Sequence, residues 1–237
     1  MQAATLRAQI EQKIPTAFRL YRRAAQGTIS TGIASLDRAV EGIPRHALTE
    51  ICGRSFGSSG KSSILLSLLA QATREHFCAL VDAGDGFDPA SGQAAGIYFP
   101  RLLWVRCGKT KVKLPPLEQA FKVADILLQS NGFGLIAVDL SAMPERVVRK
   151  VPLSSWFRFS RVVEKQSCAL VFVEQEPHAT SCAGLVLRAT ADAPLFSGKL
   201  VTQVNLKVEV ARGRGKKPVC SEHSALCSDF SLQTQWA

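Results

Sequence analysis

Apolar residues along the chain gather in short, nearly continuous runs, which alternate with longer segments of helical spacing. The runs are 48–52, 77–84, 102–108, 135–140 and 169–175, and the segments with apolar residues three and four positions apart are 61–76, 115–129 and 154–167. The runs predict buried strands and the segments predict amphipathic helices. Such an alternation is typical of parallel strands joined by crossover helices, and strands without a polar face fit a sheet covered on both sides. We therefore expect an α/β fold with a mostly parallel central sheet flanked by helices.

The C-terminal part of the chain has a different pattern. Polar and apolar residues alternate in "KLVTQVNLKVEVARG", from Lys199, and in "DFSLQTQW", from Asp229, and the turn-like "GRGKKP" lies between them. A period of two predicts strands with one face in solvent, as in antiparallel sheets. We expect antiparallel strands at one edge of the sheet. A chain of 237 residues then divides into an N-terminal helix and arm (1–27) and one core domain (28–237).

The stretch "GRSFGSSGKSS" (53–63) lies between a predicted strand and a predicted helix. It ends like a phosphate-binding loop, whose pattern is Gly, four residues, then Gly-Lys-Ser/Thr. The first glycine of that pattern is replaced by Ser55, and the nearest earlier glycine is Gly53. Backbone N–H groups of such a loop and of the following helix favour phosphate oxygens. The expected nucleotide-binding residues are Gly57, Ser58, Ser59, Gly60, Lys61, Ser62 and Ser63; the alternative is a strand-to-helix turn with a chance Gly-Lys-Ser.

A second candidate is Asp139, which closes the apolar run "LIAVDL". An aspartate at the C-terminal end of a central strand can hold the coordination shell of Mg²⁺. It could equally cap a helix that begins in "SAMPERV". Because Lys61 and Asp139 both follow predicted strands, we favour the first interpretation, with ATP and Mg²⁺ as cofactors and Ser62 and Asp139 on the metal.

The formal net charge is +10, which is typical of proteins that meet a polyanion such as nucleic acid. The candidate DNA-binding residues are Arg146, Arg149, Lys150, Arg212, Arg214, Lys216 and Lys217. The alternative is a solvated basic surface. Trp156, Phe157 and Phe159 could form a platform for base stacking, but at helical spacing they are more typical of a core or an interface.

The seven cysteines are odd in number and include no Cys-x-x-Cys pair, which suits a reducing cytoplasm. Cys220, His223 and Cys227 offer only three metal ligands, too few for a structural zinc site. No apolar window of about 18 residues predicts a membrane span, and the N-terminus does not resemble a signal peptide. We expect a cytoplasmic protein.

Several segments resemble, in order, the core of the bacterial recombinase RecA, over about residues 28–237. They are "STGIASLDRAVEGIPRHALTEICG", "SSGKSSILLSLLAQA", "CALVDAGDGFDP", "LLWVRCG", "LEQAFKVADILLQSNGFGLIAVDL" and "LVFVEQ". A closer likeness is to the RecA-like ImuA accessory proteins, which act with a mutagenic DNA polymerase in the DNA-damage response. It is carried by "KIPTAF", "VPLSSWFRFSRVVE" and "VEQEPHATSCAGLVLR".

The RecA resemblance implies a role for individual residues. Lys61 and Ser62 match the phosphate lysine and the magnesium hydroxyl, and Asp139 matches the second residue of the metal shell. Gln175 matches the glutamine that senses the γ-phosphate, and Asp88 matches a residue near the adenine. The region from His178 to Arg188 matches the second DNA-binding loop.

The chain also departs from the RecA pattern. Gly84 replaces the catalytic glutamate. The nearest carboxylate is then that of Asp85, which is the catalytic candidate together with Gln175. Ser91 replaces an aromatic residue beside the adenine. The first DNA-binding loop shrinks to "PERVVRKVP", and the large C-terminal domain is not matched. Glycine has no group that could polarise a water molecule. We expect at most a weak DNA-dependent ATPase.

The resemblance implies a nucleotide-binding protein of DNA repair and damage-induced (SOS) translesion synthesis. Its expected partners are single-stranded DNA and a RecA-type recombinase or mutagenic polymerase accessory, with self-assembly and no membrane contact. One alternative is a non-enzymatic scaffold with a relic phosphate loop. Another is a true DNA-dependent ATPase recombinase, against which Gly84 and the short first loop argue.

Overall fold

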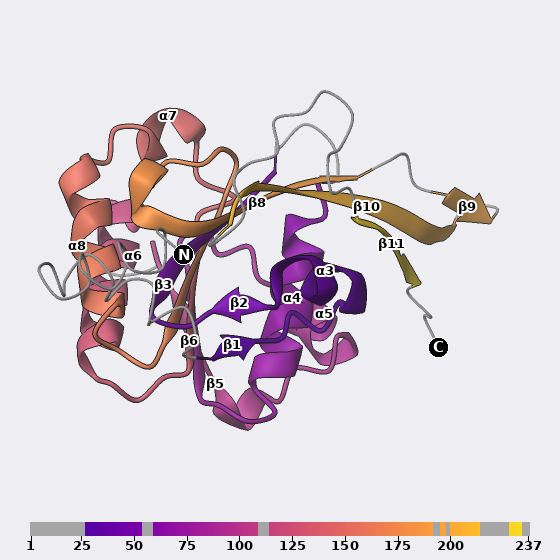
Figure 1. Ribbon diagram of the computed structural model, residues 1–237, viewed down its shortest axis with the longest axis horizontal. Coiled ribbons are helices and arrows are strands. Elements are labelled where there is room, and N and C mark those ends of the chain that lie inside the picture. The colour runs from indigo at the N-terminus through magenta and orange to yellow at the C-terminus, as the bar shows by residue number, and fades with distance from the viewer. Residues whose placement is uncertain are drawn as a thin grey trace, which may run out of the picture.

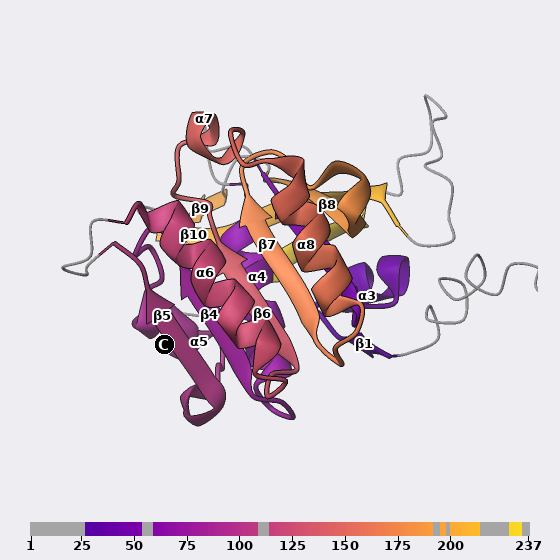
Figure 2. The same ribbon diagram turned by 90° about the vertical axis from the view of Figure 1, so that its left-hand side faces the viewer.

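The structure, a computed structural model, describes residues 27–53, 59–108, 114–191, 195–197, 200–213 and 228–233. The predicted α/β class is confirmed. A nine-stranded sheet in the order β11-β10-β8-β3-β7-β6-β4-β5, with β9 paired to β10, has helices on both faces (Figure 1, Figure 2). The predicted N-terminal helix and arm lie outside the described residues, apart from the last of them, Gly27.

Six strands of the sheet are parallel. They are β3 (Ala47–Cys52), β4 (Cys78–Asp82), β5 (Leu102–Arg106), β6 (Leu135–Asp139), β7 (Ala169–Glu174) and β8 (Ala183–Ala191). The register pairs Cys52 with Glu174 and Asp82 with Asp139. The C-terminal ends of these strands therefore meet at one edge of the sheet, as the candidate site requires.

Two helical layers cover the sheet. One holds α3 (Ala34–Val40), α4 (Lys61–Ala72) and α5 (Pro89–Ala94), and the other holds α6 (Pro116–Gln129) and α8 (Leu153–Val163) (Figure 2). The short helices α7 (Glu145–Val148), η1 (Phe99–Arg101) and η2 (Thr180–Cys182) lie in connections. The apolar face of α4 is buried because its leucines pack with Leu80 and Val171 of the sheet.

The core on the α6 and α8 side is aromatic. Trp156 and Phe159 are 1% and 0% exposed and pack edge-to-face or tilted against Phe121 and Phe172. The core interpretation of these two residues is confirmed. Phe157 is 41% exposed, because it lies on the outer face of the helix.

The antiparallel edge is also confirmed. β10 (Leu200–Arg212) pairs antiparallel with β8, with β9 (Leu195–Ser197) and with β11 (Ser228–Gln233). The expectation of a loop from His178 to Arg188 is wrong beyond Cys182, since β8 begins at Ala183 and pairs with β3. A small separate sheet joins β1 (Thr28–Ile29) to β2 (Ile43–Pro44). No helix in the described part of the chain is long and apolar enough to cross a membrane.

Candidate nucleotide-binding site

Both ends of the predicted phosphate loop need glycine. Gly60 caps α4 in the left-handed conformation (φ 76°), and a Cβ atom there would overlap the side chain of Leu206 from β10. At Gly53 a Cβ atom would lie 2.6 Å from Ser59 and 2.9 Å from the carbonyl oxygen of Ala189. Glycine avoids both conflicts. The loop ends are therefore fixed by packing; Gly57 and Ser58 lie outside the described residues.

Lys61, the first residue of α4, is only 7% exposed. Its Nζ donates a 2.7 Å hydrogen bond to the carbonyl oxygen of Gly53, at the other end of the loop. Burial lowers the pKa of Lys61, while Asp139 and Cys52 oppose that shift. An ammonium group has three N–H donors, so this bond leaves donor capacity for a phosphate.

The end of β6 places a carboxylate near Lys61. Burial is the main cause that raises the pKa of Asp139; Asp82 adds to it, and Ser141 and Lys61 lower it. Asp139 Oδ1 accepts a 2.8 Å bond from the Ser141 N–H. In the sheet, β7 lies between β3 and β6, the strands that lead to Lys61 and to Asp139. Lys61 and Asp139 nevertheless interact electrostatically across that gap.

Magnesium prefers oxygen ligands and usually takes one or two from protein. Ser62 is exposed in the first turn of α4, with the half-buried Ser63 beside it. Within the described residues, no group of three or more His, Cys, Asp or Glu side chains could hold a metal ion. The Ser62 hydroxyl and the Asp139 carboxylate offer the oxygen donors that magnesium prefers.

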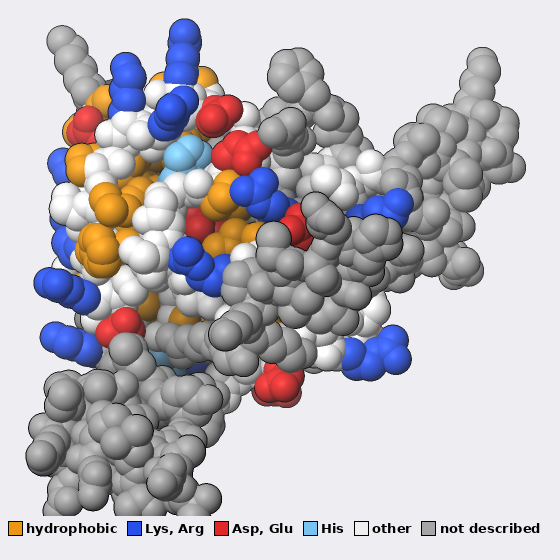
Figure 3. Space-filling model, turned by 45° about the horizontal axis from the view of Figure 1, so that its top comes forward, with side chains coloured by type: hydrophobic (Ala, Val, Ile, Leu, Met, Phe, Trp, Pro, Cys, Tyr) orange, Lys and Arg blue, Asp and Glu red, His pale blue; other side chains and the backbone are white. Residues whose placement is uncertain are grey.

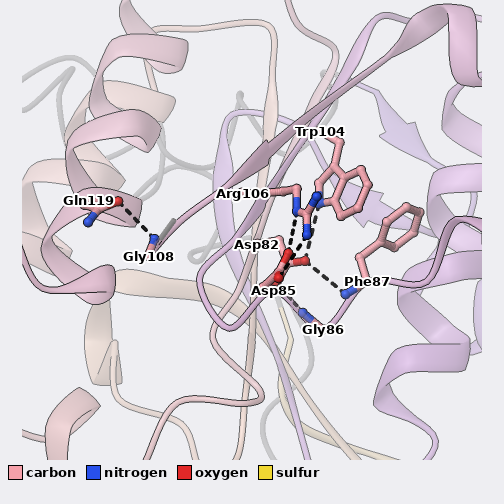
Figure 4. A network of polar contacts seen from close by, with 8 residues as sticks. All are labelled: Asp82, Asp85, Gly86, Phe87, Trp104, Arg106, Gly108 and Gln119. Carbon is pink, nitrogen blue, oxygen red and sulfur yellow. Dashed lines mark hydrogen bonds and ion pairs between the residues drawn. The ribbon is translucent and has the colours of Figure 1, made fainter. Parts of the chain in front are cut away.

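Asp82 was not predicted as a functional residue, and it shapes the neighbouring loop. Its Oδ1 accepts a bond from the Gly86 N–H (3.0 Å), and its Oδ2 accepts bonds from the Phe87 N–H (2.9 Å) and Trp104 Nε1 (3.3 Å) (Figure 4). A carboxylate with three donors is well satisfied, although it is only 1% exposed. Asp82 therefore fixes the course of residues 83–87 between β4 and β5.

Asp85 forms a bidentate ion pair with Arg106 of β5. Arg106 Nε lies 2.5 Å from Oδ1 and Nη2 lies 3.0 Å from Oδ2 (Figure 4). The guanidinium lies 4.9 Å from the ring centroid of Trp104, in a cation–π arrangement. The carboxylate of Asp85 is thus directed towards β5 and held there.

Gln175, expected by resemblance to sense the γ-phosphate, and Asp88, expected near the adenine, both have local hydrogen-bond partners. Gln175 Nε2 donates to the carbonyl oxygens of Met143 (3.0 Å) and Ser141 (3.3 Å), in the turn after β6. Asp88 caps α5: its carboxylate accepts bonds from the hydroxyl of Ser91 and from the N–H groups of Ser91 and Ala90. These bonds, that of the Ser91 hydroxyl first, lower the pKa of Asp88. Ser91, at the position of the family's aromatic residue, therefore supports the cap.

Basic side chains lie beyond this edge of the sheet. Arg146, Arg149 and Lys150 are exposed on and after α7. Several Lys and Arg side chains project from the top of the molecule in the view of Figure 3. Arg212, also exposed, ends β10 and donates to the carbonyl oxygen of Thr180. Arg214, Lys216 and Lys217, and the group Cys220, His223 and Cys227, lie outside the described residues.

Sequence reasoning missed two buried acids. Glu50 in "ALTEIC" and Glu174 in "LVFVEQ" are 0% and 1% exposed. A glutamate inside an otherwise apolar strand is the signal that could have revealed them, because ionisable groups are rarely fully buried without a partner.

A sequence model of the RecA N-terminal domain family matches residues 15–149. Among curated relatives, protein RecA of Ectopseudomonas oleovorans is 40% identical over 114 residues, 47% of this chain and 30% of its own length. Protein RecA of Marinobacter nauticus is 36% identical over 121 residues (49% and 32%), and that of Deinococcus radiodurans 36% over 115 (47% and 29%). The chain spans about a third of the length of these relatives. Since the family model covers more than half of the 237 residues, the chain belongs to the RecA N-terminal domain family.

Proposed function

We propose that this chain is a nucleotide-binding DNA-repair protein of the RecA/ImuA type, which binds ATP with Mg²⁺ and hydrolyses it weakly or not at all. The observation that carries the proposal is the contact between the two ends of the phosphate loop. Gly53 and Gly60 fix its ends, Lys61 spans it, and Asp139 lies within electrostatic reach. A relic loop has no need of a buried lysine, whose burial is unfavourable unless a partner compensates for it.

Each nucleotide-binding residue has a proposed role. The loop backbone and the N-terminus of α4 receive phosphate oxygens, and Lys61 neutralises the outer phosphates. Ser62 and Asp139 hold Mg²⁺, which would neutralise charge on the β- and γ-phosphates. Asp88 and the end of α5 lie on the adenine side by resemblance to the family.

Weak hydrolysis is proposed from the surroundings of residues 84 and 85. Gly84 has no side chain to orient a water molecule, and a Cβ atom there would overlap Ala142. The Asp85 carboxylate is engaged by Arg106. General-base assistance is worth about 10²–10⁴-fold in rate, so its loss would leave a long-lived ATP-bound state.

The proposed partners are single-stranded DNA and a RecA-type recombinase or mutagenic polymerase accessory, in damage-induced translesion synthesis. The basic residues around α7 and Arg212 support the first, because phosphate contacts need only such charges. The likeness of "VPLSSWFRFSRVVE" to ImuA proteins supports the second.

Titration with a fluorescent ATP analogue, with Mg²⁺ present, tests the proposal. We expect saturable binding that Lys61→Ala weakens and that Lys122→Ala, an exposed lysine of α6, leaves unchanged. No binding by the wild type would favour the scaffold alternative. Electron microscopy with single-stranded DNA and ATP tests the recombinase alternative, for which extended filaments with rapid ATP turnover are the expected result.

A further inference from the structure

Glu50 and Glu174 lie on the face of the sheet opposite to Lys61 and Asp139. Side chains alternate between faces along a strand. Leu48 and Phe172, two positions before these glutamates, belong to the core under α6 and α8, whereas Ala137, two positions before Asp139, belongs to the core under α4. The acidic pair is thus separate from the nucleotide site by one thickness of sheet.

Three hydrogen bonds attach segment 175–182, between β7 and β8, to this pair. Glu50 Oε1 accepts bonds from the backbone N–H groups of Ala179 (2.6 Å) and His178 (2.7 Å). Glu174 Oε2 lies 2.7 Å from Nδ1 of the His178 ring. The segment is therefore held to the core by two side chains that can each gain or lose a proton.

The second oxygen of each carboxylate is unsatisfied. Within the described residues, Glu50 Oε2 and Glu174 Oε1 are buried and have no hydrogen-bond partner. A buried ionised carboxylate is strongly unfavourable unless it is paired. Burial, the main cause, raises the pKa of Glu50 and raises the pKa of Glu174 to about 7; the bonds from His178 and Ala179 to these carboxylates act in the opposite direction and are the weaker effect. The bond to Glu174 raises the pKa of His178.

The other charged and titratable groups around the pair come from every neighbouring element. They are Arg212 at the end of β10, Arg188 on β8, Cys52 on β3, Cys182 in η2, Glu145 on α7 and Glu176 in the segment itself. Arg188 pairs with Glu176 at 3.4 Å and Arg212 donates to Thr180. Neither arginine is bonded to the two unsatisfied oxygens, which leaves protons as the compensating positive charge.

We propose that Glu50, Glu174 and His178 form a proton-dependent anchor, which holds segment 175–182 on the core while its protons are bound and releases it when they are lost. The sign is the same for both residue types. A carboxyl group whose pKa is raised from 4.5 to about 7 favours the anchored state most below pH 4.5, and that advantage is lost as the pH rises to about 7. A histidine with a raised pKa likewise stabilises the anchored state at low pH and loses this effect as it deprotonates.

Hydrogen bonds also link Glu174 and the anchored segment to the phosphate loop, to the turn after β6 and to β10. The carbonyl oxygen of Glu174 accepts a 3.1 Å bond from the Gly53 N–H, at the start of the phosphate loop. Gln175 ties the same segment to the turn after β6, and Arg212 contacts it at Thr180. Release of the segment would therefore change the support of the phosphate loop and the position of a basic surface group.

Hydrogen–deuterium exchange of the His178 and Ala179 amides, in the whole protein without nucleotide or DNA, tests the anchor. Rates are corrected for the intrinsic effect of pH. Between about pH 5 and pH 8 we expect their protection to fall by about 10-fold or more, with no comparable change in the amides inside α6. Glu174→Gln, which retains a bonding group for His178, should flatten the profile, and Glu118→Gln, an exposed residue of α6, should not.

Wild-type protection that does not change with pH would overturn the proposal, as would an unaltered profile in Glu174→Gln. If that variant does not fold, Glu50→Gln provides the same comparison. Titration of the His178 ring by NMR gives an independent measurement. We expect a midpoint above about 6.5; a midpoint at or below that value would contradict the proposal that the bond to Glu174 holds a proton on His178. Because nucleotide is absent throughout, failure here leaves the proposed function standing.

Discussion

Ala142, in the turn after β6, occupies the space that a side chain at Gly84 would need. The position where RecA-type proteins carry a catalytic glutamate is therefore closed by packing as well as by the absence of a side chain. A carboxylate side chain at position 84 can be accommodated only if the turn after β6 also changes.

We predict that Gly84→Glu alone leaves ATP turnover at the wild-type level and lowers the melting temperature, because the new side chain displaces Ala142. The double variant Gly84→Glu/Ala142→Gly should recover the fold and raise turnover by about 10²-fold, the lower end of a general-base contribution. Steady-state ATPase assays and thermal denaturation check both. A large gain in ATP turnover from Gly84→Glu alone would contradict this prediction, because it would show that the turn containing Ala142 moves aside without a second substitution.

Asp85→Asn should weaken its ion pair with Arg106 and leave ATP turnover unchanged. The pair is partly exposed, so we expect only a small loss in the free energy of unfolding. The fluorescence of Trp104, under the guanidinium, should change with it. DNA-stimulated hydrolysis that this substitution abolishes would identify Asp85 as the residue that orients water.

Lys61→Ala should weaken ATP binding by about 1–3 kcal/mol, the value of a charge-assisted hydrogen bond. Isothermal titration calorimetry with Mg²⁺ and ATP measures it. Lys122→Ala makes the same change of charge on α6 and should bind as the wild type does. Equal affinity in the Lys61 variant would mean that the amine makes no bond to the phosphates.

DNA affinity should depend on salt and not on sequence. Replacing Arg146, Arg149 and Lys150 together with alanine should reduce the slope of log affinity against log salt by up to about 3, roughly one for each phosphate that is no longer neutralised. Removal of Lys122, Arg161 and Lys165, three exposed positive charges elsewhere on the molecule, serves as a control for net charge. Replacing Arg212, Arg214, Lys216 and Lys217 together should also reduce the salt slope. An unchanged slope in either variant would exclude the replaced residues from the DNA-binding surface.

Most elements of the fold could be predicted from the sequence, because in them the spacing of the apolar residues matches the positions that are buried. The run "LIAVDL" became β6 and the segment from Pro116 became α6, both within one residue of the prediction. Strand β8 was missed because its residues were assigned to a loop by resemblance. This strand is buried because it pairs with β3 and β10. Pairing between segments that are distant in the sequence cannot be seen in the local spacing of apolar residues.

The candidate site was predictable as a set of residue types but not as an arrangement. Lys61, Ser62 and Asp139 follow from strand and loop positions. The bond from Lys61 to Gly53, the pairing of Asp85 with Arg106 and the overlap between positions 84 and 142 join segments that the strand order brings together. Hydrophobic periodicity does not specify that order, so these relationships could not be read from the sequence.

The packing of Leu206 against Gly60 has a consequence for how this protein is made. On a ribosome the chain emerges from its N-terminus, so β3, the loop and α4 are all available long before β10. Because β10 supplies the side chain that covers the start of α4, the loop lacks part of its final support until nearly the whole domain has been synthesised. Nascent chains that stop before residue 206 should therefore lack a finished nucleotide cradle, and ATP would be captured only after β10 has been synthesised.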